Sequence, residues 1–194
     1  HHHIEDKIPI CDFFINPEQN DCGFNEEKLC SAGLAWYFTA ALNKKIKSDY
    51  NLKEALAFAS IGTICDMVPL TNCNRVIAKR GMEALSTTSN IGLKALKLAT
   101  GISKISSYEV GFIIGPRINA AGRMKNGSMV IDLFTSQNEQ EALAIATQLN
   151  NLNQDRQAIE KNILKKIHEE INEKDIPWGI ALASSTFHTG IIGI

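Results

Sequence analysis

The apolar positions along the chain predict mostly helices, joined by a few short strands. Apolar residues recur at helical spacing in four segments of the first half, which predicts helices over residues 26–42, 51–67, 74–85 and 91–99. Asn25 is the expected N-cap of the first helix. The second helix is so uniformly apolar that we expect it to be deeply buried, and Pro69 ends it.

Two short apolar runs predict strands. Residues 8–15 (IPICDFFI) are rich in β-branched and aromatic side chains and are closed by Asn16-Pro17, which predicts a buried strand that leads into a loop. Residues 178–185 (WGIALASS) predict the first strand of a further α/β unit. This order of elements favours an α/β fold.

A long helix is predicted between these regions. Ser136 and Glu139 form a capping box, and apolar residues then follow at intervals of three and four, with Arg156 occupying one slot of the stripe. A helix of this length spans roughly 50 Å, more than the width of a small domain. We therefore expect the helix to bridge two lobes, with one domain over residues 1–135, the helix over 136–176 and a second domain beginning at 177–194.

Residues 111–127 (GFIIGPRINAAGRMKNG) predict a shaped loop or a broken element, because glycines and a proline interrupt any regular pattern. Arg117, Asn119 and Arg123 lie among the small residues of this segment. Small residues let a ligand approach the backbone, and guanidinium groups match the oxygens of a phosphate. Arginines that pair with nearby carboxylates are the alternative interpretation.

Two further residues are candidates for chemistry. Asp66 follows a run with almost no polar side chains, where an ionised carboxylate is costly unless it pairs with a cation or a metal. Capping of the turn before Pro69 explains it equally well. His188 lies between a strand-like run and Gly190, a common place for a ligand-facing side chain. A lone histidine is nevertheless more often structural.

Composition narrows the function classes. A net charge of −1 argues against nucleic-acid binding through overall charge, so any phosphate binding must come from a local cluster. No apolar run reaches the ~18 residues of a membrane-spanning helix. Five cysteines without a C-x-x-C pair predict a reducing, cytoplasmic compartment rather than a disulfide framework. The chain lacks an initiator methionine and stops within an apolar run, so we expect an internal fragment.

Four motifs resemble those of one family. They are HHIEDKIPICDFFINP, GTICDMVPL with the following Asn74-Arg75, GPRINAAGRM and FHTGIIGI. Their order and spacing are similar to those of the RecJ family, single-strand-specific 5′-exonucleases of the DHH phosphoesterase superfamily, over essentially the whole chain. Three histidines at a terminus usually mark a purification tag. The resemblance instead assigns His2 and His3 to the family's Asp-His-His signature. His1 stands at the aspartate position, as a substitution, an artificial junction or a natural variant.

The resemblance also implies a chemistry. In the family, two divalent ions, Mn²⁺ or Mg²⁺, activate water and stabilise the leaving oxygen of a phosphodiester. It implies that His2, His3 and Asp66 are metal ligands, and that His3 and Asp66 are catalytic. For contacts with the phosphates of the nucleic acid it implies five residues, namely Arg117, Asn119, Arg123, His188 and Gly190.

The implied fold is the C-terminal part of a DHH phosphoesterase domain, a long bridging helix and the start of a DHH-associated α/β domain. The implied function is 5′-to-3′ hydrolysis of single-stranded DNA in bacterial-type cytosol, in repair and recombination, with single-strand-binding protein and a helicase as partners. We expect the fragment alone to be inactive or nearly so, because the family's further metal ligands are expected outside it. Two alternatives are a DHH-type phosphodiesterase of short oligonucleotides or cyclic dinucleotides, and a single-strand-binding protein that has lost catalysis, which His1 favours.

Overall fold

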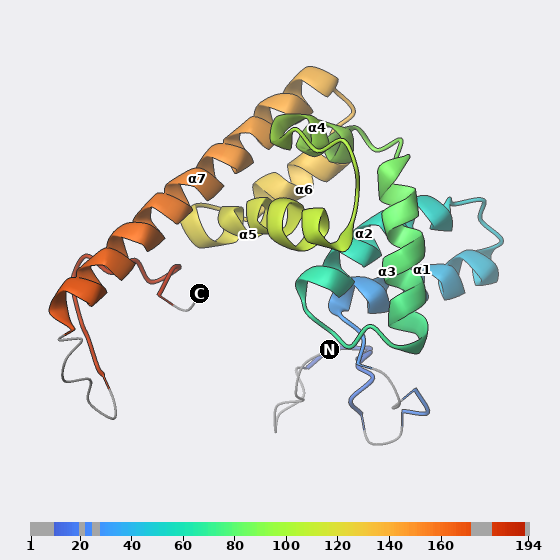
Figure 1. Ribbon diagram of the computed structural model, residues 1–194. Helices are drawn as coiled ribbons and strands as arrows, with labels where there is room; N and C mark the ends of the chain where they lie inside the picture. Colours follow the sequence, from blue (N-terminus) through green and yellow to red (C-terminus); the bar gives the residue numbers. More distant parts are fainter. Residues whose placement is uncertain (1–9, 20–21, 25–27, 172–179, 193–194) are drawn as a thin grey trace. The chain divides into compact units, whose positions relative to one another are not determined.

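The computed structural model describes residues 10–19, 22–24, 28–171 and 180–192, and all regular secondary structure in these ranges is helical (Figure 1). The described residues divide into two compact units, those up to Asn90 with Ile102–Gly115, and Ile91–Gly101 with those from Pro116 onward. The helices are α1 (Ser31–Ile46), α2 (Leu52–Cys65), α3 (Asn72–Ser86), α4 (Ile91–Thr100), the π-helix η1 (Glu109–Ile114), α5 (Gly115–Met124), α6 (Ser128–Thr135) and α7 (Glu139–Glu170).

The α/β expectation is wrong for the part of the chain that the structure describes. Neither residues 10–15 nor residues 180–185 form a strand. Ile10 and Phe13 were expected to be buried, yet they are almost fully exposed. A strand is stable only when its N–H and C=O groups pair with a neighbouring strand. No described segment forms such a ladder with either run, so local β propensity is not sufficient to make a strand here.

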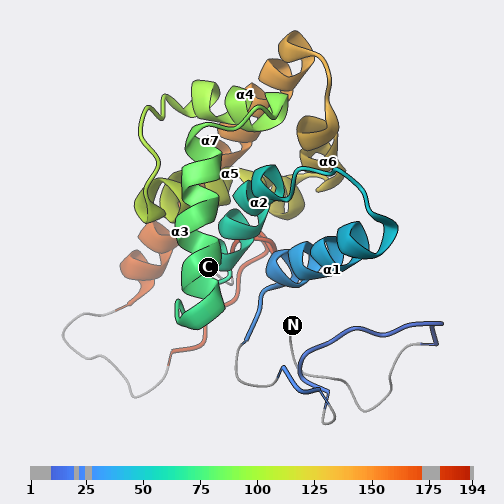
Figure 2. The same ribbon diagram turned by 90° about the vertical axis from the view of Figure 1, so that its right-hand side faces the viewer.

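The first unit is built around α2, which packs against α1 and α3 (Figures 1 and 2). Leu29, which precedes α1, forms a buried apolar cluster with Ala59 on α2 and Ile77 on α3, and partly buried α1 side chains such as Trp36 pack against it. Gly81 on α3 allows the backbones to touch, since a Cβ there would overlap the carbonyl oxygen of Leu56 on α2. The predicted burial of α2 is therefore confirmed, and small residues on both helices explain how close the two helices come.

The first helix begins later than predicted. Asn25 lies outside the described residues, and α1 starts at Ser31 with Cys30 as its N-cap. The Cys30 sulfur accepts a hydrogen bond from the backbone N–H of Gly33 at 3.2 Å. Because Leu29 and Cys30 are both buried, the chain is already held in the core before the helix begins. The other three predicted helices are confirmed as α2, α3 and α4, with boundaries shifted by one or two residues.

The second unit is formed by α4 and α6 packed against α7, with α5 contributing buried alanines. Leu93, Leu133 and Leu149 are fully buried in this core. Gly92 is needed because a Cβ at this position would overlap the carbonyl oxygen of Leu133. The core of this unit therefore depends on close backbone contact between α4 and α6.

The long helix is confirmed as α7, with 32 residues, but its predicted cap is wrong. Asn138 is the N-cap, and its Oδ1 accepts hydrogen bonds from the N–H groups of Gln140 at 2.9 Å and Glu141 at 3.1 Å. The Ser136 hydroxyl instead donates to the carbonyl oxygen of Asn138 at 3.1 Å. Ser136 thus stabilises the turn that precedes the cap.

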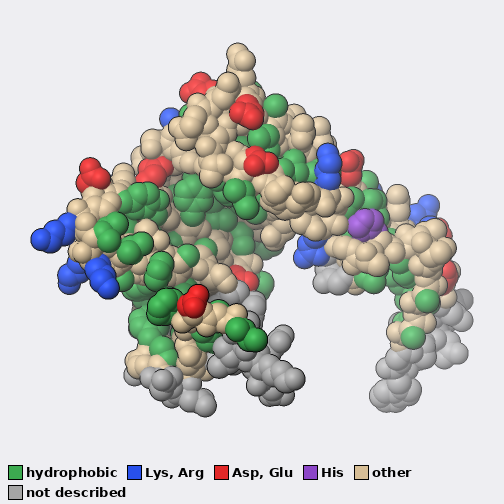
Figure 3. Space-filling model, turned by 180° about the vertical axis from the view of Figure 1, so that it is seen from behind, with side chains coloured by type: hydrophobic (Ala, Val, Ile, Leu, Met, Phe, Trp, Pro, Cys, Tyr) green, Lys and Arg blue, Asp and Glu red, His purple; other side chains and the backbone are tan. Residues whose placement is uncertain are grey.

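Apolar side chains are exposed on the first unit. Phe38, Ile46, Met67 and Val76 are each more than half exposed. Figure 3 shows many hydrophobic side chains at the surface of the face that it draws. Such a surface is typical of a face that contacts another macromolecule or segment. None of the helices in the described ranges is long and apolar enough to cross a lipid bilayer.

Candidate functional site

Asp66 lies at the C-terminal end of α2, where it is the C-cap and its backbone N–H donates to the carbonyl of Gly62 at 2.9 Å. The chain reverses at the next residue, Met67, which has a φ of 53°. The apolar run before Asp66 predicted apolar surroundings for its carboxylate, but the structure exposes this residue. The reason is that α2 ends at Cys65, so the buried face of the helix does not extend to Asp66.

Cys65, next to Asp66, anchors the end of α2 to η1. Its thiol donates to the carbonyl oxygen of Val110 at 3.6 Å. Burial raises the pKa of this thiol to about 11, with further contributions from the neighbouring Asp66 and from Cys30. Gly115, at the end of η1, must lack a side chain because a Cβ there would overlap the Cys65 sulfur. The end of α2 is thus fixed against the end of η1 within the first unit.

The GPRINAAGRM segment is helical, and the predicted loop is wrong. The backbone N–H of Gly115 donates to the carbonyl of Val110, five residues earlier, which makes η1 a π-helix. The α-helix α5 then follows directly, and Ala120 and Ala121 on one of its faces are fully buried. This tertiary burial outweighs the roughly 1 kcal/mol by which glycine is disfavoured in a helix. The segment is irregular, as expected, but the irregularity is a change from a π-helix to an α-helix at Gly115.

The helix places Arg117 apart from the other two predicted phosphate ligands. Residues two apart on an α-helix point about 200° away from each other, whereas residues four apart share a face. Asn119 and Arg123 therefore lie on one exposed face, while Arg117 faces α7. Its Nε donates to Oδ1 of Asn150 on α7 at 3.2 Å. Burial lowers the pKa of Arg117, and the positive charge of Arg156 lowers it further.

Arg123, His188 and Gly190 lie together in the structure, a proximity that the sequence did not predict. Nη1 of Arg123 donates to the carbonyl oxygen of Gly190 at 3.1 Å. Nδ1 of His188 accepts a hydrogen bond from the backbone N–H of Gly190 at 3.1 Å, so its proton in the neutral form is on Nε2. In the described part of the FHTGIIGI segment, residues 189–192 form a turn, in which the N–H of Ile191 donates to the carbonyl of His188 at 2.9 Å.

Sequence reasoning missed Asn150 and Asn153 on α7. Asn150 faces α5, and Asn153 faces the interior. Asn150 bonds to Arg117, and Asn153 is fully buried. The signal was present as two amides and an arginine, Arg156, spaced by three along a predicted helix. Arg156 was noted as a break in the apolar stripe, but a charge on a long helix is usually solvated, and this one is largely buried.

The described residues do not by themselves make a metal site. Mn²⁺ and Mg²⁺ need several oxygen or imidazole ligands. The parts of the chain that the structure describes contain no group of three or more His, Cys, Asp or Glu side chains that could hold an ion. The exposed Asp66 carboxylate can supply one oxygen ligand. His1, His2 and His3 lie outside the described residues, so the roles of His2 and His3 as metal ligands stay predictions.

No family model matches the chain, but individual relatives match all of it. RecJ of Haemophilus influenzae, described as a single-stranded-DNA-specific exonuclease, is 32% identical over 210 residues, which cover 100% of this chain and 36% of the relative. RecJ of Bacillus subtilis is 32% identical over 197 residues, which cover 100% of this chain and 24% of the relative. A crystal structure of exonuclease RecJ bound to manganese matches 99% of this chain and 48% of its own, with a TM-score of 0.85 and 30% identity.

The chain belongs to the RecJ family. The family assignment made from the four motifs is thereby confirmed, and the match in three dimensions supports a RecJ fold. A second solved structure, RecJ of Thermus thermophilus in complex with Mg²⁺, matches 77% of this chain and 24% of its own with a TM-score of 0.70 at 32% identity. The chain spans 24 to 37% of the length of the curated RecJ relatives it matches.

Proposed function

We propose that this RecJ-family chain contributes to a metal-dependent exonuclease that hydrolyses phosphodiester bonds of single-stranded DNA in the 5′-to-3′ direction. The observation that carries this proposal is the match over 99% of the chain, at a TM-score of 0.85, to an exonuclease RecJ bound to manganese. The curated relatives are described as single-stranded-DNA-specific exonucleases. A role in repair and recombination and a cytoplasmic location belong to the proposal, as do single-strand-binding protein and a helicase as partners.

In this proposal Asp66, His2 and His3 hold Mn²⁺ or Mg²⁺, and His3 and Asp66 act at the scissile phosphate. The ions, when bound, supply activation of water and neutralisation of charge on the phosphodiester. The exposed position of Asp66 at the end of α2 supports its part, because a ligand must reach the ion and the substrate. The polarity of digestion and the choice of metal rest on the family alone.

The phosphate contacts divide into two groups in this proposal. Asn119 and Arg123 present one exposed face of α5, and the link from Arg123 to Gly190 places the His188 turn beside that face. Arg117 acts from the opposite side of the same helix, towards α7. We keep the domain limits of 1–135, 136–176 and 177–194 as a proposal for the whole enzyme, with α7 as the bridge.

The test is digestion of a labelled single strand by the whole protein in the presence of Mn²⁺. Asp66→Ala is expected to lower the rate by about 10²-fold or more, since even residues that only orient a metal ligand cost 10- to 100-fold. Asp49→Ala, which removes an exposed carboxylate from the same unit, is the matched control and should keep full activity. Oligonucleotides labelled at either end report the polarity.

Two results would contradict the proposal in different ways. Equal activity of Asp66→Ala and Asp49→Ala would remove Asp66 from the metal site. A wild-type protein that binds single strands but does not digest them with Mn²⁺ or Mg²⁺ would indicate a binding protein that has lost catalysis, in line with His1 in place of an aspartate.

A further inference from the structure

The inward face of α7 is polar in its middle. The buried and half-buried positions of this helix follow one stripe through Ala142, Ala146, Leu149, Asn153, Arg156, Glu160 and Ile163. Apolar residues occupy both ends of the stripe, as expected for a helix that packs on a core. Three consecutive positions in the centre, Asn153, Arg156 and Glu160, carry polar or charged groups instead. Such groups are costly to bury unless they have partners, so their position calls for a reason other than packing.

The side-chain amide of Asn153 has a hydrogen-bond partner for its oxygen but none among the described residues for its nitrogen. Its side chain is fully buried, and its Oδ1 accepts a hydrogen bond from Nε of Arg156 at 3.3 Å. Its Nδ2 has no hydrogen-bond partner among the described residues. Buried polar atoms nearly always have a partner, so a buried amide nitrogen without one indicates a missing acceptor.

One guanidinium group bonds to this amide, and a second reaches α7 one helical turn away. Arg156 is held by Asn153 and by an ion pair with Glu160, with Nη1 and Oε2 2.8 Å apart. Arg117 reaches α7 from α5 and donates to Asn150, which precedes Asn153 by one helical turn. Burial lowers the pKa of Arg117, and the positive charge of Arg156 lowers it further, so the two guanidinium groups repel each other. An anion bound between the two arginines would relieve this repulsion.

We propose that Asn153, Arg156 and Arg117 form a binding site for a phosphate group of the DNA strand. This inference rests on the proposed function and adds α7 to the surface that holds the substrate. Phosphate oxygens accept hydrogen bonds from planar guanidinium groups and from an amide nitrogen, which are the donors present here. An internal phosphodiester and a terminal phosphate offer the same chemistry.

The first test compares two arginine variants of the whole protein for affinity towards a labelled oligothymidylate, with no divalent ion added. Arg156→Gln is expected to weaken binding about tenfold, because it removes a charge-assisted hydrogen bond to the phosphate. The slope of log K against log salt should also fall by about 0.7, as for one lost phosphate contact on a single strand.

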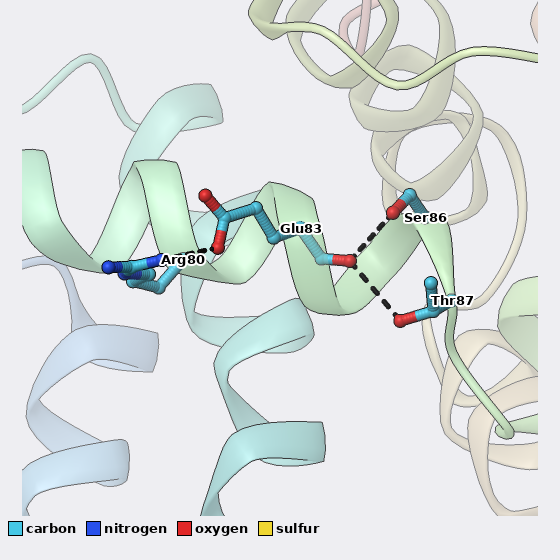
Figure 4. A network of polar contacts seen from close by, with 4 residues as sticks. All are labelled: Arg80, Glu83, Ser86 and Thr87. Atoms are coloured by element: carbon cyan, nitrogen blue, oxygen red, sulfur yellow. Dashed lines mark hydrogen bonds and ion pairs between the residues drawn. The ribbon is translucent and has the colours of Figure 1, made fainter.

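Arg80→Gln is the matched control. Arg80 also forms an ion pair within one helix, with Nη1 2.8 Å from Oε2 of Glu83, but it is exposed on α3 (Figure 4). The substitution removes the same charge and the same kind of ion pair from the first unit. It should leave both the affinity and the salt slope at the wild-type values.

A second variant guards against loss of folding as the explanation. Asn153→Asp would place a carboxylate beside Arg156, so it should keep or raise the melting temperature while it repels a phosphate. We expect it to weaken binding about tenfold or more at an unchanged or higher melting temperature. A purely structural role for Asn153 does not predict this combination.

The arms of the experiment separate the possible outcomes. An effect on 5′-phosphorylated oligonucleotides alone identifies a terminal phosphate, and an equal effect on 5′-hydroxyl oligonucleotides identifies internal phosphodiesters. If the wild type binds and digests single strands but Arg156→Gln and Asn153→Asp bind as tightly as the wild type, the site is overturned and the proposed function stands. If the wild type neither binds nor digests single strands, both the proposed function and this phosphate site are wrong.

Discussion

Arg123 contacts Gly190 in two ways, through a hydrogen bond from its side chain and through close approach of the two backbones. Nη1 of Arg123 donates to the carbonyl oxygen of Gly190 at 3.1 Å, and a Cβ at Gly190 would lie 2.5 Å from the Arg123 carbonyl oxygen. Two motifs 67 residues apart in the sequence thus form one local structure. The close approach requires glycine at position 190.

Gly190→Ala is expected to loosen the turn over residues 188–192. The added methyl group would collide with the Arg123 carbonyl, and overpacking of this kind costs about 1–3 kcal/mol. The cost is smallest if the turn leaves α5, so the amide hydrogens of the turn should exchange faster in hydrogen–deuterium exchange. Gly122→Ala is the control, because its Cβ meets nothing within 4 Å and alanine favours the helix. Unchanged exchange in Gly190→Ala would contradict the contact.

Gly115 and Cys65 should be energetically coupled. Gly115→Ala forces a Cβ against the Cys65 sulfur and is expected to lower the free energy of unfolding by about 1–3 kcal/mol. The double variant Cys65→Ala/Gly115→Ala removes the collision and should recover part of this loss. Urea unfolding of the two single variants and the double variant gives the coupling energy, which we expect to be about 0.5–3 kcal/mol. Additive effects would show that the two residues do not touch.

Cys65 should also make stability depend on alkaline pH. Its pKa is raised to about 11 in the folded protein, above the ordinary value of 9.0, so folding favours the neutral thiol. The resulting stabilisation is fully present below about pH 9 and is lost as the pH rises towards 11. Urea unfolding from pH 8 to 11 measures this effect by comparing the wild type with Cys65→Ser. Over this window the unfolding free energy of the wild type should fall relative to that of Cys65→Ser. A constant difference would argue that the thiol is solvated.

Glu54 is expected to hold the connection between α3 and α4. Its Oε1 accepts hydrogen bonds from the Thr88 hydroxyl and from the backbone N–H groups of Ser89 at 2.9 Å and Asn90 at 3.2 Å. Glu54→Ala should therefore lower the free energy of unfolding by about 1.5–3 kcal/mol, the usual loss for a hydrogen-bonded charged group.

Glu83→Ala provides the comparison for Glu54. Glu83 is an exposed carboxylate whose side chain pairs with Arg80 (Figure 4). Exposed ion pairs contribute little, so this variant should unfold at nearly the wild-type urea concentration. Equal losses for Glu54→Ala and Glu83→Ala would mean that the contacts of Glu54 do not stabilise the connection.

Sequence patterns predicted secondary structure best where the structure depends on the periodicity of a single helix. The apolar spacing located α2, α3, α4 and α7 to within a few residues, because a packed helical face repeats at a fixed interval. The eight-residue α6 had no expectation of its own. The GPRINAAGRM segment was misjudged, because the burial of Ala120 and Ala121 and the tight contact at Gly115 depend on other parts of the chain.

For the candidate site, too, some features could be predicted from the sequence and others depended on tertiary packing. The four motifs identified the RecJ family from the sequence, and the relatives confirm it, because motifs record which residue types a chemistry requires. The burial of Asn153 and the hydrogen bond from Arg117 to Asn150 on α7 were not visible there. They depend on which face of α5 meets α7, and that is set by packing between residues far apart in the chain.

By itself, therefore, the sequence determined the helical periodicity, the family and the candidate residues, all of which depend on local order along the chain. The tertiary structure alone decided that residues 10–15 and 180–185 form no strand, that Asp66 is exposed and that Arg123 meets Gly190. Each of these depends on whether a partner is present in space. A strand needs a neighbouring strand, a buried charge needs a covering surface, and a close backbone contact needs a second segment to approach.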